Sequence, residues 1–255
     1  MNDERTEGGD RIYRYGETPE RPFELPDMDS EALEKIEKHY EHHFGKSPGV
    51  YHEILSELLH IDVHVFPPTP ERACYVLATT GMSDRPMPGT PPENAELAHA
   101  ELLIYLPPDW PLFKNTWEFT HDDAGYWPVA ALKFLARMPH EYGSFLSWGH
   151  TIPNGPDAAP IGESTKMGCW CLLSPAFVPE EAASLEIRPG KTVHFFQIVP
   201  LYREEMGVKL KHRMEGLLGL LEKAKISHEQ FFVLNPIRPN AAAPRGLFGW
   251  LKRGT

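Results

Sequence analysis

The chain has 255 residues, of which 41% are hydrophobic and 24% are charged, a composition typical of globular proteins and unlike that of disordered chains. Its formal net charge is −11, which argues against binding to nucleic acid through the phosphate backbone. The charge is uneven, because residues 1–45 hold thirteen Asp and Glu against six Lys and Arg. Residues 237–255 hold four basic residues and no acidic one.

The cysteines indicate a reducing compartment. Cys74, Cys169 and Cys171 are too few, and odd in number, for a disulfide framework. No apolar run follows a basic start as in a signal peptide, and none approaches the ~20 residues that cross a bilayer. We therefore expect a cytoplasmic protein without a membrane span.

The first part of the chain is predicted to be a leader followed by a helix. Residues 1–28 are polar and contain three prolines, which favours a flexible acidic leader. Residues 29–45 are predicted as a helix, because Asp29 or Ser30 can cap its start and Gly45 can end it. The buried side of this helix is marked by apolar residues three and four positions apart, namely Leu33, Ile36, Tyr40 and Phe44.

Three strands are predicted next, at residues 59–66, 73–81 and 98–106. Three prolines between residues 67 and 70 separate the first two strands, since proline cannot donate a hydrogen bond to a sheet. The third strand has a continuous apolar centre, which indicates burial on both faces.

The second half predicts two more helices among strands. One helix begins near Pro128 and is expected to stop before Pro139. The other covers residues 203–225, with a predicted core stripe of Met206, Leu210, Met214, Leu217, Leu218 and Leu221. Further strands are expected at residues 166–174, 184–188, 191–202 and 229–234.

These elements predict an α+β fold, with a mixed, largely antiparallel sheet packed against about three main helices. We expect one domain over residues 29–236, followed by a basic and apolar C-terminal tail at 237–255. The role of the GLFGWLKRGT sequence at the end of this tail stays open.

The stretch HIDVHVF, residues 60–66, raises the question of a metal site. His60, Asp62 and His64 would share one face of a strand, and Ile61, Val63 and Val65 would face the core. Two imidazoles and a carboxylate can ligate zinc, so a metal-dependent hydrolase is one hypothesis. Without HExxH or CxxC, and with 13 histidines in the chain, a polar sheet face or a row of histidine–carboxylate hydrogen bonds is favoured, and we expect no metal or cofactor. Whether that face is covered by a helix, open to water or open to a partner stays open.

Motifs of other enzyme classes are missing from the sequence. There is no GxSxG, GxxxxGK[ST] or GxGxxG pattern, so we expect no enzymatic activity. Two loops are instead candidate recognition sites. One is the stretch around Ser83 and Asp84, which is either a binding loop or a turn held by side-chain hydrogen bonds. The other holds Trp110 between prolines, as an interface anchor or as a plug folded back on the core.

Seven segments, taken in order between about residue 60 and residue 224, resemble the suppressor of fused family in its stand-alone bacterial form. They are IDVHVFPPTPER, YVLATTGMSDRPM, AELLIYLPPDWP, WPVAALKFLARMPHEYG, WGHTIPNG, FFQIVPLYREEM and GLLGLLEKA. The resemblance implies a mixed α+β domain equivalent to the N-terminal lobe of the animal protein.

The resemblance also implies a function in protein binding. The animal relative is a non-enzymatic regulator that holds a transcription factor by pairing with a short strand of it, and bacterial members are proposed to be immunity proteins that neutralise cognate toxins. The partner implied here is thus a protein, such as a toxin. A partner strand would pair with an open sheet edge, since the second lobe of the animal protein has no counterpart in this sequence.

The candidate partner-binding residues combine the resemblance with the loop analysis. The stretch Gly81, Met82, Ser83 and Asp84 matches the Gly-x-Ser-Asp stretch that lies near the partner-binding surface of the family. The loop analysis adds Arg85 and Trp110 to this predicted surface.

Overall fold

The computed structural model describes residues 4–14, 25–53, 57–111 and 125–243. Within these ranges one sheet has the strand order β1-β2-β3-β4-β8-β6-β5, and β7 also pairs with β8. The strands are β1 (Gly49–Tyr51), β2 (Asp62–Phe66), β3 (Tyr75–Thr80), β4 (His99–Leu106), β5 (Thr151–Pro153), β6 (Cys169–Leu173), β7 (Ser184–Arg188) and β8 (Lys191–Leu201). The α-helices are α1 (Ser30–Phe44), α2 (Trp127–Tyr142), α3 (Arg203–Ala224) and α4 (His228–Phe232), and the 3-10 helices are η1 (Met82–Asp84), η2 (Pro92–Leu97) and η4 (Glu180–Ala183).

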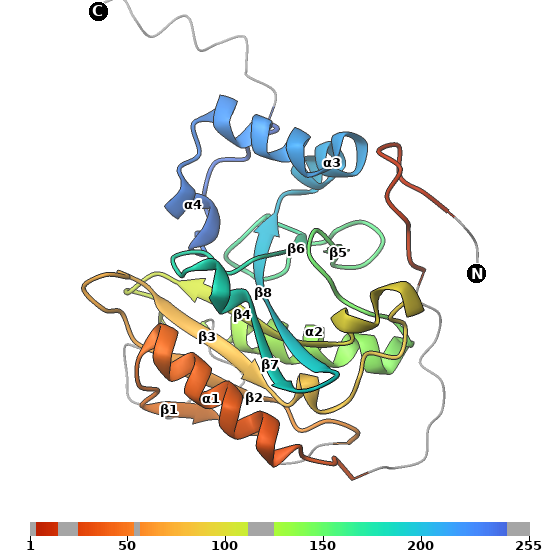
Figure 1. Cartoon of the computed structure of the whole chain (residues 1–255). Coiled ribbons are helices and arrows are strands. Elements are labelled where there is room, and N and C mark those ends of the chain that lie inside the picture. Colours follow the sequence, from red (N-terminus) through yellow and green to blue (C-terminus); the bar gives the residue numbers. More distant parts are fainter. Residues whose placement is uncertain (1–3, 15–24, 54–56, 112–124, 244–255) are drawn as a thin grey trace, which may run out of the picture.

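The sheet is mixed and largely antiparallel, and this confirms the predicted fold class. Strands β4 and β8 form its parallel pair, and the other pairings are antiparallel. The long strand β8 joins the two halves of the sheet, because its first part pairs with β4 and β7 and its last part pairs with β6 (Figure 1).

Helices cover both faces of the central strands. On one face Tyr40 and Phe44 of α1 pack in a cluster with Phe66, Val76 and Phe195. On the other face α2 packs in a second cluster that includes its Val129, Leu132 and Leu135 with Val63, Val65, Leu102 and Ile104 of the sheet. Alternate residues of one strand therefore enter different cores, which explains the continuous apolar centre of β4.

Two predicted elements differ from the structure. Helix α2 continues through Pro139 and ends at Gly143, which has a left-handed φ of 62° and donates its N–H to the Pro139 carbonyl. A proline in the last turn removes a single helical hydrogen bond, so the helix can tolerate it there. The strand predicted at 229–234 is instead α4, because Ser227 and Gln230 form a reciprocal capping box that starts a helix.

Helix α3 has a break that changes its buried face. Arg213 has a φ of 57°, so the residues before and after it follow different helical phases. Met214, Leu217 and Leu221 are buried as predicted, whereas Leu218 is exposed. In the first half the buried residues are Glu205 and Lys209, and the predicted Met206 and Leu210 are only half-buried.

Both ends of the described chain pack on α3. Residues 4–14, part of the expected flexible leader, lie beside α3, where the Gly8 N–H donates to the Leu210 carbonyl at 2.9 Å (Figure 1). Arg238 is buried and paired with Glu205, so the packed region extends past the expected boundary at residue 236. The tail residues 244–255 lie outside the described ranges. Among the residues that the structure describes, no helix is long and apolar enough to span a membrane.

Candidate functional site: a locked loop and an aromatic groove

The loop predicted as a recognition site begins at Gly81, where the chain leaves β3. Gly81 has a φ of 98°, and a Cβ at this position would lie 1.9 Å from the His60 carbonyl oxygen. Only glycine combines this dihedral angle with so close an approach of two backbones. The glycine therefore turns the chain into η1 and places Ser83 above β4.

A buried carboxylate on β4 anchors this loop. Glu101 is 0% exposed and accepts hydrogen bonds from the Thr79 hydroxyl at 2.6 Å, the Ser83 hydroxyl at 2.7 Å and the Ser83 N–H at 3.0 Å. His99 fixes the other side of the loop, because its Nδ1 lies 2.8 Å from the Ser83 carbonyl and donates to it. Burial raises the pKa of Glu101 to about 7, despite the hydrogen bonds that favour its charged form.

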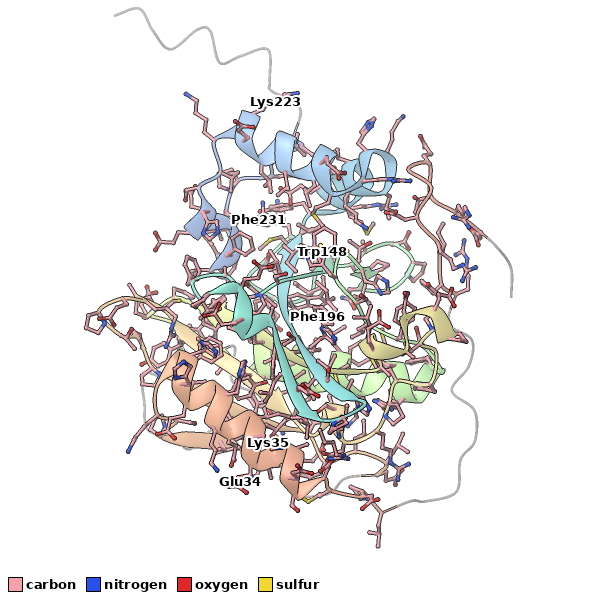
Figure 2. The ribbon with its side chains drawn as sticks, viewed as in Figure 1. Glu34, Lys35, Trp148, Phe196, Lys223 and Phe231 are labelled. Atoms are coloured by element: carbon pink, nitrogen blue, oxygen red, sulfur yellow. The ribbon has the colours of Figure 1, made fainter. Side chains whose placement is uncertain are left out.

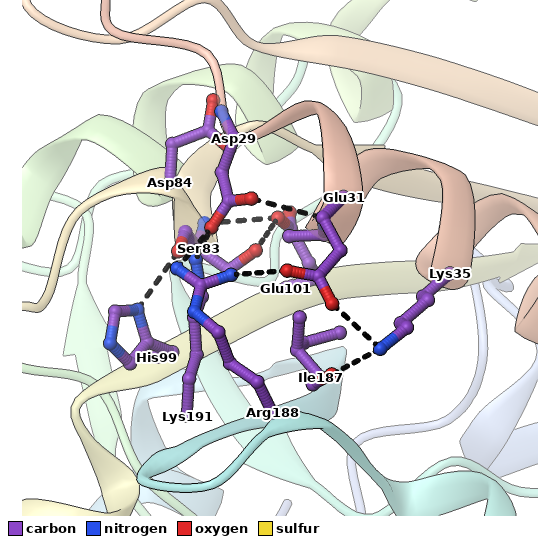
Figure 3. A network of polar contacts seen from close by, with 11 residues as sticks. Asp29, Glu31, Lys35, Ser83, Asp84, His99, Glu101, Ile187, Arg188 and Lys191 are labelled. Atoms are coloured by element: carbon purple, nitrogen blue, oxygen red, sulfur yellow. Dashed lines mark hydrogen bonds and ion pairs between the residues drawn. The ribbon is translucent and has the colours of Figure 1, made fainter.

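A second layer of charges connects the loop to α1 and to the β7–β8 hairpin (Figure 3). Asp29 caps α1 by accepting from the Ala32 N–H, and it also accepts from Arg188 at 2.7 Å and Lys191 at 2.8 Å. The hydrogen bond from Arg188 is the main reason that the pKa of Asp29 lies well below its usual range. The Asp84 carboxylate accepts from the Asp29 N–H at 3.3 Å, and burial raises the pKa of Asp84 to about 6.

These contacts change the interpretation of the predicted partner-binding residues. Met82 and Ser83 are 0% exposed, so their side chains are not available for contact with a partner. Trp110 is 5% exposed and donates its indole N–H to the Gly125 carbonyl, so it is the plug and not the exposed anchor. Only Asp84 and Arg85 of the predicted set are half-buried side chains that reach the surface.

We expect Glu101 to make stability depend on pH. Its native pKa of about 7 exceeds the value of an unfolded chain, so the native state keeps a proton that the unfolded state has lost. The contribution of Glu101 is therefore present below about pH 4.5 and lost as the pH rises towards 7. Relative to Glu101→Gln, the wild type should lose about 2–3 kcal/mol of unfolding free energy between pH 5 and pH 8. Urea denaturation at both pH values measures this difference, and parallel pH profiles for the two proteins would refute it.

The structure separates the three residues of the predicted metal site. His64 lies beneath α1, with its Nε2 3.0 Å from the Thr80 hydroxyl, and burial lowers its pKa to about 4. His60 and Asp62 remain near the surface, with Nε2 and Oδ1 3.1 Å apart. His60, Asp62 and His64 therefore do not form one open cluster, because α1 covers the part of the strand face that holds His64. The predicted burial of Ile61, Val63 and Val65 is confirmed.

The structure also contains a surface groove that was not among the predicted sites. We call it the β5 groove, because it runs along the edge strand β5, and its volume is about 1210 Å³. Residues from the N-terminal segment, α2, the β5 region and α3 line it, among them Arg11, Tyr13, Trp127, Phe134, Met138, Trp148, Ile152, Lys209 and Arg213.

Two large apolar side chains of the β5 groove are exposed to solvent. Phe134 of α2 is 53% exposed, and Trp148, in the turn before β5, is 52% exposed (Figure 2). Within the described residues β5 pairs only with β6, so its other edge has no strand partner, and all three residues of β5 line the groove. The exposure of Phe134, in a helix that is largely buried, could not be foreseen from the sequence.

The protein is thus an α+β domain whose sheet carries a helix on each face. The β5 groove lies at one edge of this sheet and is open to solvent. A family model described as suppressor of fused protein (SUFU) matches residues 57–239. The chain therefore belongs to the suppressor of fused family. No curated protein sequence matches it.

Solved structures share this fold at low sequence identity. A suppressor of fused homologue from Neisseria gonorrhoeae is 18% identical, with a TM-score of 0.55 over 84% of this chain and 96% of the other. A chain of the Sufu-Fu complex is 16% identical, with a TM-score of 0.57 over 86% of this chain and 93% of the other. Suppressor of fused from Drosophila is 18% identical, with a TM-score of 0.57 over 82% of this chain and 51% of the Drosophila chain.

Proposed function

We propose that the protein is a non-enzymatic protein-binding module, and that it acts as an immunity protein that binds and neutralises a cognate toxin. Membership of the suppressor of fused family supports the first part, and so does a related fold found in a protein complex, that of Sufu with Fu. The observation that carries the proposal is the pair of half-exposed aromatic side chains in the β5 groove.

Exposed aromatic residues in a concave surface suit a protein partner. Trp148 and Phe134 each offer a large apolar area, and their side chains have few rotatable bonds, so little conformational entropy is lost when they bind. Tryptophan is among the commonest residues that dominate the binding energy at interfaces. Burying them against a partner would remove from water a surface that the isolated protein leaves exposed.

The edge of β5 supplies backbone groups beside these anchors. An extended partner segment could add to the sheet there, as in other recognition by strand addition. The strand is three residues long and includes Pro153, which has no N–H, so few backbone hydrogen bonds are available. Most of the affinity would then come from the side chains of the groove. Asp84 and Arg85 are a second proposed contact. They lie outside the β5 groove, in the loop that begins at Gly81 and is anchored by Glu101.

The hydrolase hypothesis has lost its basis in this structure. It required His60, Asp62 and His64 on one open face, and His64 is buried under α1.

Growth protection tests the proposal. A toxin encoded beside the gene of this protein is expressed in a host that it kills, together with the wild type or a variant. We expect the wild type to restore growth and to bind the purified toxin. Trp148→Ser should lose the protection and weaken binding about 30-fold or more, the effect of removing a residue worth at least 2 kcal/mol.

Two variants make the result specific. Leu218→Ser changes a side chain that is 50% exposed on α3 and does not line the β5 groove, so it should protect as well as the wild type. Arg85→Glu tests the second proposed contact separately. Full protection by Trp148→Ser would show that the partner does not use the groove, and wild-type protein that binds no toxin would contradict the proposed role.

A further inference from the structure

A cluster of two histidines and one carboxylate lies where β1 ends and β2 begins. Tyr51 pairs with Val63 in the antiparallel register of these strands, so His52 follows opposite Asp62. His60, two residues before Asp62, completes the group. The ligand atoms of His52, His60 and Asp62 all lie within 4.8 Å of one another.

The two imidazoles contact different oxygens of the same carboxylate. His52 Nδ1 lies 2.9 Å from Asp62 Oδ2, and His60 Nε2 lies 3.1 Å from Asp62 Oδ1. In a tetrahedral zinc site with bonds of about 2.0–2.1 Å, neighbouring ligand atoms are roughly 3.3 Å apart. The contact between His52 and Asp62 is a hydrogen bond, and both separations are also close to the spacing of ligands in a zinc coordination shell. Small side-chain rotations would therefore admit an ion in place of these contacts.

Contacts around the cluster hold its ligands in position. The Glu53 N–H donates to Asp62 Oδ1 at 3.1 Å, and the Glu53 carboxylate accepts from the Ile61 N–H at 3.0 Å. Arg137 of α2 forms an ion pair with the same Glu53 carboxylate. These bonds fix the backbone on both sides of the site, which is the function of the groups behind the ligands in metal centres.

We propose that His52, His60 and Asp62 bind a divalent transition-metal ion of the zinc type. The ligand set of two nitrogens and one oxygen suits Zn²⁺ and leaves further coordination positions to water. The His52 side chain is 69% exposed, so an ion can reach the site from solvent. The proposal differs from the predicted set, because His52 from β1 takes the place of the buried His64, and it is independent of the proposed toxin binding.

One nearby cation should weaken the site. Lys133 Nζ donates a hydrogen bond to the carbonyl oxygen of His52, at a distance of 3.4 Å. A bound dication would be repelled by the protonated amine. Removing that amine should therefore tighten metal binding, which loss of a merely structural contact would not do.

The helix α1 contains a competing group of histidines. The rings of His39 and His43, one helical turn apart, have centroids 4.5 Å apart, and those of His42 and His43 are 4.7 Å apart. A pair of histidines four residues apart can also chelate a metal, so His43→Ala is the matched control for the proposed site.

Titration of the full chain with Zn²⁺ by calorimetry, with Co²⁺ absorption as a second readout, tests the proposal. We expect one equivalent to bind in the wild type. Loss of any one ligand, in His52→Ala, His60→Ala or Asp62→Asn, should weaken the affinity by more than the roughly 10–100-fold that loss of an outer-shell partner costs. Lys133→Met should strengthen it several-fold, and His43→Ala should leave it unchanged.

The opposite results would overturn the inference. Wild-type protein without saturable binding would do so, as would one-equivalent binding that survives His52→Ala or disappears in His43→Ala. Circular dichroism and thermal unfolding of the metal-free variants show whether each variant is folded, so that a loss of metal binding can be distinguished from a loss of structure. Because the His52 side chain is largely exposed, His52→Ala should fold as the wild type does.

Discussion

Arg238→Met should lower the unfolding free energy by about 3–5 kcal/mol, the usual cost of breaking a buried ion pair by removing one partner. The guanidinium forms two hydrogen bonds with Glu205, at 2.7 and 2.6 Å, and the two side chains are 1% and 0% exposed. Methionine would fill most of the space but would leave the Glu205 charge in the interior without its counter-ion. Urea denaturation at neutral pH measures the loss.

The physical reason can be checked with two further variants. Adding Glu205→Gln to Arg238→Met removes the uncompensated charge. The Tyr202 and Ala241 N–H groups donate to different oxygens of Glu205, so the amide keeps an acceptor for one of them, and the double variant should recover part of the lost stability. Arg14→Met removes an ion pair with Glu4 that has similar distances but is exposed to solvent, and should cost far less stability than Arg238→Met. Equal losses for Arg238→Met and Arg14→Met would show that burial does not control the effect.

Gly81→Ala is expected to have the second largest effect. An alanine with a φ near 98° is strained by about 1–2 kcal/mol, and its Cβ would lie 1.9 Å from the His60 carbonyl oxygen. The backbone must move to relieve this contact, so we expect a total loss above about 2 kcal/mol. The movement would also displace Ser83 from Glu101, and the Ser83 N–H would become less protected from hydrogen exchange.

Gly190 provides the matched control. It has a φ of 84° in the turn between β7 and β8, but a Cβ there would meet no atom within 4 Å. Gly190→Ala should therefore show the dihedral cost alone. If both substitutions reduced stability equally, the close approach to His60 would play no part in fixing the loop.

Local patterns in the sequence were enough to predict most of the fold. The spacing of Ile36, Tyr40 and Phe44 identified the buried side of α1, and the alternation of Ile61, Val63 and Val65 identified one core face of β2. Whether the opposite face of β2 is open depends on where α1 packs. That is a contact between segments that no local pattern records, so His64 was expected in a polar row and is buried.

The candidate sites depended still more on contacts distant in sequence. Ser83 is buried because Glu101, from another strand, accepts its hydrogen bonds, and Trp110 is buried because Gly125 offers a carbonyl to its indole. In the same way, the buried side of the first half of α3 is polar because Arg238 comes back to pair with Glu205. Each of these contacts joins residues that local sequence rules do not pair.

The β5 groove combines segments that are about 200 residues apart in the chain. Asp10 of the N-terminal segment meets Lys209 of α3 at 3.5 Å on its lining. The turn that carries Trp148 could be found by its glycine and tryptophan, but its position beside α2 and α3 could not.

The affinity of the purified protein for the proposed toxin partner, measured for the wild type, Trp148→Ser and Leu218→Ser, tests the central claim most directly. We predict that Trp148→Ser raises the Kd about 30-fold or more and leaves thermal stability nearly unchanged, because the indole is half exposed, whereas Leu218→Ser keeps the wild-type Kd. Equal Kd values for all three proteins would contradict binding through the β5 groove.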